Sequence, residues 1–241
     1  MVKVPTLVEM LQSGVHFGHI KGKWHPKMAQ FIFSTRNDVH IINLEETAKQ
    51  LQNACQYLGD LGSRRALVLF VGTKRQAVGV IESAAKRIGM PYVTKRWLGG
   101  TLTNFAIIQK LIQQYLSLKS ILSSEQRNRY TKKEQLGIER KVEKLDVSIG
   151  GLTQLSRKPD AIVIVDLKRE RTAIREAAHT KTSVVAITDT NTNPDKVAYP
   201  IPANDDAVGS VEMIVNILAD AYQQGRESAA AEPQAAPAPV N

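Results

Sequence analysis

Residues 71–77, VGTKRQA, have the types and order that could bind a phosphate group. A glycine after an apolar run, followed by threonine and the cations Lys74 and Arg75, would present backbone N–H groups to an anion where a helix begins. A P-loop needs a glycine, four spacer residues and then Gly-Lys-Ser/Thr, and a dinucleotide-binding turn needs three spaced glycines. Neither spacing is present. The segment therefore favours contact of Lys74 and Arg75 with an RNA phosphate over the binding of a nucleotide.

Residues 14–28, GVHFGHIKGKWHPKM, combine histidines, lysines and Trp24 in a short glycine-containing segment. A divalent metal site would need more ligands than His19 and its neighbours provide, and a distant carboxylate such as Asp189 or Asp205 would have to complete it. Histidine spacing without cysteine is weak evidence, so no metal ligand is predicted here. The favoured interpretation is an arm in which Trp24 stacks or packs and three lysines meet RNA phosphates, namely Lys21, Lys23 and Lys27.

Residues 95–105, KRWLGGTLTNF, again place two cations beside a tryptophan. Lys95 and Arg96 can grip a sugar–phosphate backbone, and a neighbouring aromatic ring can stack on an unpaired base. We expect the two cations to contact RNA, whereas Trp97 is expected to fill the core at the base of the following helix. The glycine pair after it indicates a tight turn.

Residues 189–207, DTNTNPDKVAYPIPANDDA, form the segment where an enzyme would carry its metal or base. Ligands of open α/β sheets lie beyond the carboxyl ends of the strands, and this acidic segment follows an apolar run. Together with VGTK it supports an alternative hypothesis, an α/β enzyme or nucleotide-binding protein. No Ser-His or Cys-His pair can be assigned beside the carboxylates, however. Three prolines favour a rigid structural loop, so no catalytic residue is predicted.

The net charge of +9 is unevenly distributed along the chain. Residues 1–103 hold 14 Lys/Arg against 6 Asp/Glu, residues 104–150 hold 9 against 5, and residues 151–241 hold 9 against 12. The excess before residue 151 favours a polyanionic partner, because each phosphate that a basic side chain neutralises releases condensed counterions. Charge alone leaves open the alternative of a basic protein without such a partner.

Composition argues against several other classes of protein. Hydrophobic residues make up 43% and charged residues 23%, a balance typical of a globular domain. No apolar run approaches the roughly 20 residues of a membrane span. The single cysteine, Cys55, excludes an internal disulfide and zinc-ribbon spacing. The first residues lack the unbroken apolar stretch of a secretory signal, so the cytosol is the expected compartment.

Continuous β-branched runs predict strands that are covered on both faces, at residues 39–44, 66–72, 161–166 and 183–188. Amphipathic helices are expected over residues 45–61, 74–88, 169–179 and 207–224. Strands that alternate with helices of this length imply βαβ units, and so a parallel sheet with right-handed crossovers. The predicted fold class is therefore α/β.

Between residues 104 and 150 apolar positions recur every three or four residues, interrupted at SSEQRNRYT and without a strand signal. Two amphipathic helices joined by a polar turn are expected to pair as a protruding antiparallel coiled-coil hairpin, because each narrow stripe can be buried only against the other. A solvated helical face would look similar, but RNA contact is favoured. The cations of its tip and flanks are Arg127, Arg129, Lys132, Lys133, Arg140, Lys141 and Lys144.

The expected organisation is a discontinuous α/β domain, residues 1–103 plus 151–227, interrupted by the coiled-coil insertion at residues 104–150. Residues 228–241, SAAAEPQAAPAPVN, are rich in alanine and proline. They cannot bury enough apolar surface to offset the entropy of ordering, so a disordered tail is predicted.

The motifs GVHFGH with WHPKM, FVGTKRQA, YVTKRWLGGTLTNF and DTNTNPDKVAYPIPANDDA stand in the order and spacing of one known family. Through them the chain resembles the bacterial small-subunit ribosomal protein two family, over nearly the whole sequence from residue 4 to residue 221. The tryptophan–glycine segment and Pro-Ile-Pro-Ala-Asn-Asp-Asp are the most specific. Asn193, His25 and residues 180–183 depart from the family pattern, and the asparagine weakens a metal role for its loop.

The resemblance implies a flavodoxin-like three-layer sheet with an inserted coiled-coil hairpin, no enzymatic activity and no cofactor. It implies a structural constituent of the small ribosomal subunit that binds 16S rRNA between head and body on the solvent side. It also implies contact with other small-subunit proteins, including docking of the large RNA-capturing ribosomal protein one, and hence a part in translation initiation in the cytoplasm. Neither a membrane nor a small-molecule substrate is implied.

Overall fold

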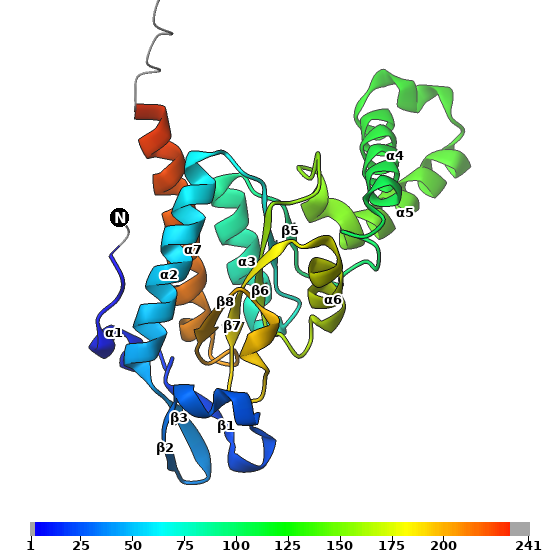
Figure 1. Ribbon diagram of the computed structural model, residues 1–241. Helices are drawn as coiled ribbons and strands as arrows, with labels where there is room; N and C mark the ends of the chain where they lie inside the picture. Colours follow the sequence, from blue (N-terminus) through cyan, green and yellow to red (C-terminus); the bar gives the residue numbers. More distant parts are fainter. Residues whose placement is uncertain (1–2, 232–241) are drawn as a thin grey trace, which may run out of the picture.

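The computed structural model describes residues 3–231, and its centre is a five-stranded parallel sheet (Figure 1). The strands lie in the order β5-β4-β6-β7-β8, which is the doubly wound order of flavodoxin-like folds. Their bounds are Val68–Val71 for β4, Tyr92–Val93 for β5, Ala161–Val165 for β6, Ser183–Thr188 for β7 and Tyr199–Pro202 for β8. The predicted α/β class with a parallel sheet is confirmed.

Alternate side chains of the central strands enter two separate cores, because helices cover both faces of the sheet. In β4, Phe70 joins the first core and Leu69 the second. The first core is covered by α2 (Leu44–Ser63), α3 (Arg75–Ile88) and α7 (Val208–Ala231). The second is covered by α6 (Arg171–Thr180) and by parts of α4 (Phe105–Ser123) and α5 (Lys132–Ile149). The sheet is therefore the middle of three layers.

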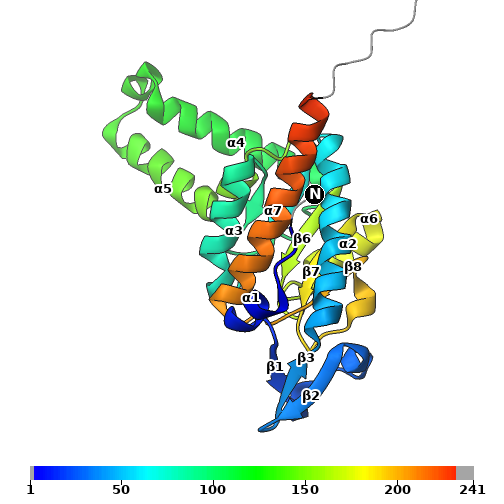
Figure 2. The same ribbon diagram turned by 90° about the vertical axis from the view of Figure 1, so that its left-hand side faces the viewer.

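Helices α2 and α7 lie side by side at very close range, because glycines stand at their contact (Figure 2). A Cβ atom built on Gly62 would lie 2.0 Å from the carbonyl oxygen of Tyr222, and one on Gly225 would lie 2.0 Å from that of Gly59. Both obstacles are backbone atoms, which have no other rotamer to adopt. Any side chain at these positions must push the helices apart.

Gly62→Ala is expected to lower the free energy of unfolding by about 1–3 kcal/mol, because the added methyl group separates α2 from α7 and disturbs the core between them. Gly79→Ala in α3 is the matched control, since nothing lies within 4 Å of its Cβ position and alanine has the higher helix propensity. Urea denaturation checks both variants. Equal stability of Gly62→Ala and the parent protein would show that the helices separate without cost.

A second, antiparallel sheet has the strand order β1-β3-β2, with bounds Phe17–Ile20, Val39–Ile42 and Ile32–Arg36 respectively. The prediction that residues 39–44 form a strand of the parallel sheet is therefore wrong. Asn37 and Asp38 both have positive φ, 49° and 59°, and together make the tight two-residue turn that pairs β3 with β2. The prediction rested on the continuous apolar run of residues 39–44 and took no account of the turn residues directly before it.

The interpretation of residues 189–207 as a loop is also wrong in part, because they contain β8. This strand pairs in parallel with β7 alone, at the edge of the sheet. An edge strand needs backbone hydrogen bonds on one side only, so it tolerates Pro200 and Pro202, which have no N–H group to donate. The prolines that argued for a loop are compatible with this position.

Helices α4 and α5, joined by the 3-10 helix η3 (Glu125–Arg129), form an arm that projects from the sheet (Figures 1 and 2). We call residues 105–149 the α4–α5 arm. Burial along it is greatest at its base, where Ile108, Ile112 and Ile149 join the second core of the sheet domain. The expectation that the apolar faces of the two helices are buried only against each other is thus wrong at the base of the arm. A coiled-coil supertwist of the arm stays a prediction.

Helix α7 continues to Ala231 and so includes residues 228–231, which the sequence assigned to a disordered tail. The boundary of that tail was therefore placed too early. A run of alanine has high helix propensity and extends α7 by a turn. The rest of the predicted tail, residues 232–241, lies outside the described residues.

Candidate nucleic-acid interface

Lys95 and Arg96 lie on the loop between β5 and α4, and both side chains are exposed. Trp97, next to them, is only 7% exposed and belongs to the second core, as expected for a residue that fills the base of the arm. The loop thus has two cations directed outward and one indole directed inward. A buried carboxylate from α6 holds the indole in this orientation.

The carboxylate of Glu176, in α6, organises the loop that carries the two cations. Its Oε1 atom accepts hydrogen bonds from the Trp97 indole N–H at 3.0 Å and from the Gly100 backbone N–H at 2.8 Å. Its Oε2 atom accepts from the backbone N–H groups of Leu102 at 3.0 Å and Thr103 at 3.3 Å, and from the Thr103 hydroxyl. Both oxygens are therefore used, and the loop is tied to α6 at five points.

Burial alone would raise the pKa of Glu176, but hydrogen bonds from Trp97 and from the backbone of Leu102 and Gly100 outweigh it and lower that pKa below its usual value. Sequence reasoning did not identify this residue. The available signal was a glutamate between Ala173 and Ala177 on the buried face of the predicted helix. A charged side chain at such a position requires partners, but the sequence alone does not name them.

The N-terminal arm, residues 14–28, places its predicted cations on the surface. Lys21 and Lys23 are exposed in the 3-10 helix η1 (Lys21–Lys23). Trp24 is 40% exposed, with its ring 5.4 Å from that of His40, so it packs on one side and leaves the other accessible. Lys27 forms an ion pair with Asp195. Lys27 would therefore have to exchange this carboxylate for a phosphate, whereas the other two lysines have no such partner within residues 3–231.

The α4–α5 arm also presents its predicted cations to solvent. Arg127 at the tip forms an ion pair with Glu139 at 2.7 Å, and this pair links the turn to α5. The remaining predicted cations of the arm are exposed, namely Arg129, Lys132, Lys133, Arg140, Lys141 and Lys144. Tyr115 in α4 donates a hydrogen bond to Asp146 in α5 and joins the two helices nearer the base. The arm thus holds a row of cations away from the domain.

Lys74 and Arg75 are neighbours in sequence but differ in environment. Arg75 is exposed at the start of α3. The Lys74 side chain is 13% exposed, and its ammonium group lies 2.6 Å from Asp205, 2.7 Å from Asp206 and 3.9 Å from Asp166. The placement of Lys74 does not agree with the prediction that it contacts RNA, because three carboxylates already surround its charge. Only Arg75 remains a candidate at this segment.

A group of ligating side chains lies beyond the carboxyl ends of the parallel strands. His19, Asp189, Asp205 and Asp206 each offer one ligand atom, and these atoms lie within 4.8 Å of one another. The sequence raised a metal site of His19 with Asp189 or Asp205 and placed Asp206 in the acidic segment where an enzyme would carry its metal or base, but no metal ligand was predicted. We call these four residues the carboxylate cluster. Its nitrogen and oxygen donors suit a divalent cation such as Zn²⁺.

The electrostatics of the carboxylate cluster depend on Lys74. Burial first, then Asp189 and Asp166, raise the pKa of Asp205 to about 7, although Lys74 opposes this shift. A hydrogen bond to Asp189, at 3.0 Å, raises the pKa of His19 despite its partial burial. The Lys74 ammonium group lies against Asp205 and Asp206 and so offsets part of the negative charge of the carboxylate cluster.

Residues 10–225 match the family model described as ribosomal protein S2, which is most of the chain. The chain belongs to the ribosomal protein S2 family. The resemblance stated from the motifs is thereby confirmed. A relative from Thermobifida fusca named small ribosomal subunit protein uS2 is 45% identical over 226 residues, which cover 93% of this chain and 77% of that protein. Another of that name, from Psychrobacter cryohalolentis, is 46% identical over 230 residues, covering 94% and 87%.

Membership of the ribosomal protein S2 family decides between the two hypotheses raised by the sequence. The family consists of structural ribosomal proteins, so the chain is not an enzyme. The α/β sheet with acidic side chains beyond its strands is a frame that many activities share, and such a fold does not by itself imply catalysis. Among the helices of residues 3–231, none combines the length and apolar character that crossing a bilayer requires.

Proposed function

We propose that the chain is a structural constituent of the small ribosomal subunit and that it binds 16S rRNA. One observation carries this proposal: the exposed Lys95 and Arg96 stand on a loop that five hydrogen bonds to the buried Glu176 hold in place. Because these bonds already order the loop, less backbone entropy is lost when its cations meet a phosphate, which favours positioning contacts with a folded RNA.

The other proposed contacts lie on separate elements, so that together they suit the shape of a folded RNA better than a short linear segment. The N-terminal arm contributes Lys21, Lys23 and Trp24, and α3 contributes Arg75. The α4–α5 arm contributes its row of exposed cations. Phosphate contacts of this kind fix register and orientation with little reading of bases.

The proposed place of the chain is between head and body on the solvent side of the subunit, in ribosomes of the cytoplasm. We further propose that it supports docking of the large RNA-capturing ribosomal protein one and hence translation initiation. The antiparallel sheet supports a protein contact, because large apolar side chains are exposed there: Phe33 is 75% exposed, and Phe17 and Ile20 are each 49% exposed. Apolar surface of this kind suits a protein partner better than an RNA backbone.

Binding to a 16S rRNA fragment is expected to weaken steeply with salt, because each phosphate contact contributes about 0.9 to the slope of log affinity against log salt on duplex and about 0.7 on single strands. Filter binding at several potassium chloride concentrations measures this slope. Several contacts predict a slope of several units. A flat salt dependence would contradict the proposal, since the proposed contacts are mainly electrostatic.

A tagged copy of the protein is expected to sediment in sucrose gradients with the small subunit and with complete ribosomes. A tagged basic protein of similar charge but unrelated family controls for nonspecific adsorption. Recovery of the chain only at the top of the gradient would contradict a structural role in the ribosome. Comparing ribosomes with and without protein one tests the docking part of the proposal separately.

A further inference from the structure

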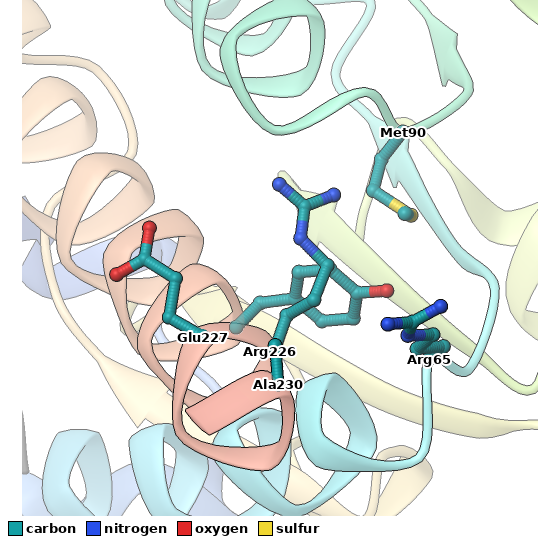
Figure 3. A pocket seen from close by; sticks show the side chains of 6 residues that line it. Arg65, Met90, Arg226, Glu227 and Ala230 are labelled. Carbon is teal, nitrogen blue, oxygen red and sulfur yellow. The ribbon is translucent and has the colours of Figure 1, made fainter. Parts of the chain in front are cut away.

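A hollow of about 420 Å³ lies where α2 ends and β4 begins. This is the end of the sheet opposite the carboxylate cluster, because that cluster lies beyond the carboxyl ends of the strands. Its lining residues come from the α2–β4 turn, the end of α3 and the last turns of α7: Arg65, Met90, Tyr222, Arg226, Glu227 and Ala230. Figure 3 shows the guanidinium groups of Arg65 and Arg226 and the side chain of Met90 around one common space.

Arg226 is held in position by the backbone of a neighbouring helix. Its Nη1 atom donates a hydrogen bond to the carbonyl oxygen of Ile88 at 3.0 Å, and the side chain is half-buried. A guanidinium group has five N–H donors in a fixed planar fork, so this bond leaves others for a ligand. Arg226 is thus an oriented donor rather than a mobile surface charge.

Arg65 reaches the same hollow from a backbone position that usually favours glycine. Its φ is 50°, in the left-handed region, and it ends α2 through hydrogen bonds from its own N–H to Gly62 and from the Ala66 N–H to Leu61. A non-glycine residue there costs about 1 kcal/mol. The side chain that this strained position carries is the second guanidinium group of the hollow.

The two guanidinium groups lack compensation by acidic side chains. Within residues 3–231, neither Arg65 nor Arg226 forms a salt bridge. Glu227 contributes to the lining, but its Oε1 atom accepts a hydrogen bond from Gln223 at 2.8 Å, and Figure 3 shows its carboxylate directed away from both arginines. Two like charges around one hollow favour an anion between them.

The remaining wall of the hollow is apolar in character. The Tyr222 hydroxyl donates to the carbonyl oxygen of Ala66 at 2.8 Å, so its polar atom already has a partner, and Met90 is half-buried opposite. A small inorganic anion would leave this wall uncovered. A phosphate that carries a sugar would contact the arginines with its oxygens and the wall with its carbon atoms.

We propose that the hollow binds one phosphate group of a nucleotide, bridged between Arg65 and Arg226. Resting on the proposed function, we assign this phosphate to the rRNA backbone. The site combines Arg65 of the basic first 103 residues with Arg226 of the acidic last part of the chain, at the end of α7 and away from the α4–α5 arm. Arg226 is held in place by its bond to Ile88, and Arg65 supplies a second guanidinium group. Each guanidinium group can bind a phosphate with two parallel hydrogen bonds, which a lysine does not provide.

A double-mutant cycle tests the bridge. Arg65→Ala, Arg226→Ala and the double variant are compared with the parent protein for binding to a 16S rRNA fragment over a range of salt. Because both side chains meet one phosphate, the salt slope of the double variant should fall by about one and not by two. Either single variant should already lose most of the affinity that the double variant loses, roughly tenfold at physiological salt.

Two controls protect the interpretation from effects on folding. Arg64→Ala removes an adjacent exposed arginine that does not line the hollow, and it should change the salt slope least. Arg226→Lys keeps a cation but loses the fork, so it should retain the slope and lose part of the affinity. Unchanged circular dichroism spectra and melting temperatures show that each variant is folded.

The source of the phosphate is decided by titrating the parent protein with adenosine monophosphate and with inorganic phosphate, followed by NMR of the arginine side chains. Shifts of Arg65 and Arg226 with the nucleotide alone, absent in the double variant, would support the pocket but assign it to a free nucleotide. If affinity, slope and arginine signals all match the parent protein, the pocket is refuted. A parent protein without salt-dependent rRNA binding would instead refute the proposed function.

Discussion

Glu176→Ala is expected to lower the free energy of unfolding by about 3–4 kcal/mol, the largest effect of any single substitution discussed. The change leaves the Trp97 indole and the backbone donors of Gly100, Leu102 and Thr103 without their acceptor. Each buried donor that loses its partner costs about 1–3 kcal/mol, partly offset where water enters. Urea denaturation followed by far-ultraviolet circular dichroism measures the change.

Arg175→Ala is the matched control, because Arg175 is the exposed neighbour on the same helix and should change stability by no more than about 0.5 kcal/mol. Glu176→Gln should not restore stability fully. An amide has one accepting oxygen, whereas both carboxylate oxygens accept here, so one set of donors would face an NH₂ group. Full stability of the glutamine variant would show that the loop does not depend on both oxygens.

The same carboxylate predicts how this part of stability depends on pH. Because hydrogen bonds depress the pKa of Glu176 in the folded state, its charge stabilises the fold above the unfolded pKa of 4.5, and this contribution is lost as pH falls through the folded pKa. The stability difference between the parent protein and Glu176→Gln should therefore narrow in acid. A difference that stays constant below pH 4.5 would contradict the proposed role of the charge.

Lys95→Ala combined with Arg96→Ala is expected to weaken binding to a 16S rRNA fragment by roughly ten- to hundredfold near physiological salt and to lower the salt slope by about two. Both side chains are exposed, so their loss should leave the fold intact. Filter binding measures affinity and slope, and incorporation of the variant into small subunits measures the consequence. Lys49→Ala, an exposed lysine of α2 outside the proposed interface, is the control.

An unfolded double variant would mean that Lys95 and Arg96 support the core instead of contacting RNA. A folded double variant with unchanged affinity would remove the loop from the interface. Combining the two changes with Glu176→Gln separates the effect of the loop's position on RNA binding from the effect of the charges of Lys95 and Arg96. If Glu176 acts only by placing the loop, the glutamine change should weaken RNA binding in the parent background and much less once the two cations are absent.

The sequence was sufficient for the main elements of the sheet domain. Strands β4, β6 and β7 were predicted from continuous apolar runs, and α2, α3, α6 and α7 from amphipathic periodicity. The predicted bounds are close except at the end of α7, which was placed at residue 224 and lies at Ala231. These signals are local, because a residue covered on both faces of a strand is apolar whatever covers it. The assignment failed where an apolar run follows a tight turn, as at Asn37 and Asp38, and where prolines occupy an edge strand.

The exposed cations were also predictable as a group, because charge and exposure usually coincide. Their individual environments were not. Lys74 and Arg75 are adjacent in sequence, yet one is surrounded by three carboxylates and the other is exposed. Asp205 and Asp206 reach Lys74 from more than a hundred residues away, and nothing in the local pattern VGTKRQA indicates them.

The family, and the exposure of most of the predicted cations, follow from the amino-acid sequence. Only the tertiary structure shows which side chains and loops are held in place, and which residues distant in sequence hold them. Glu176 meets a loop 73 to 79 positions earlier, and Arg226 meets the end of α3 138 positions earlier. Such partners are set by the packing of the helices on the sheet, which brings together side chains that are distant in sequence and that no local pattern connects.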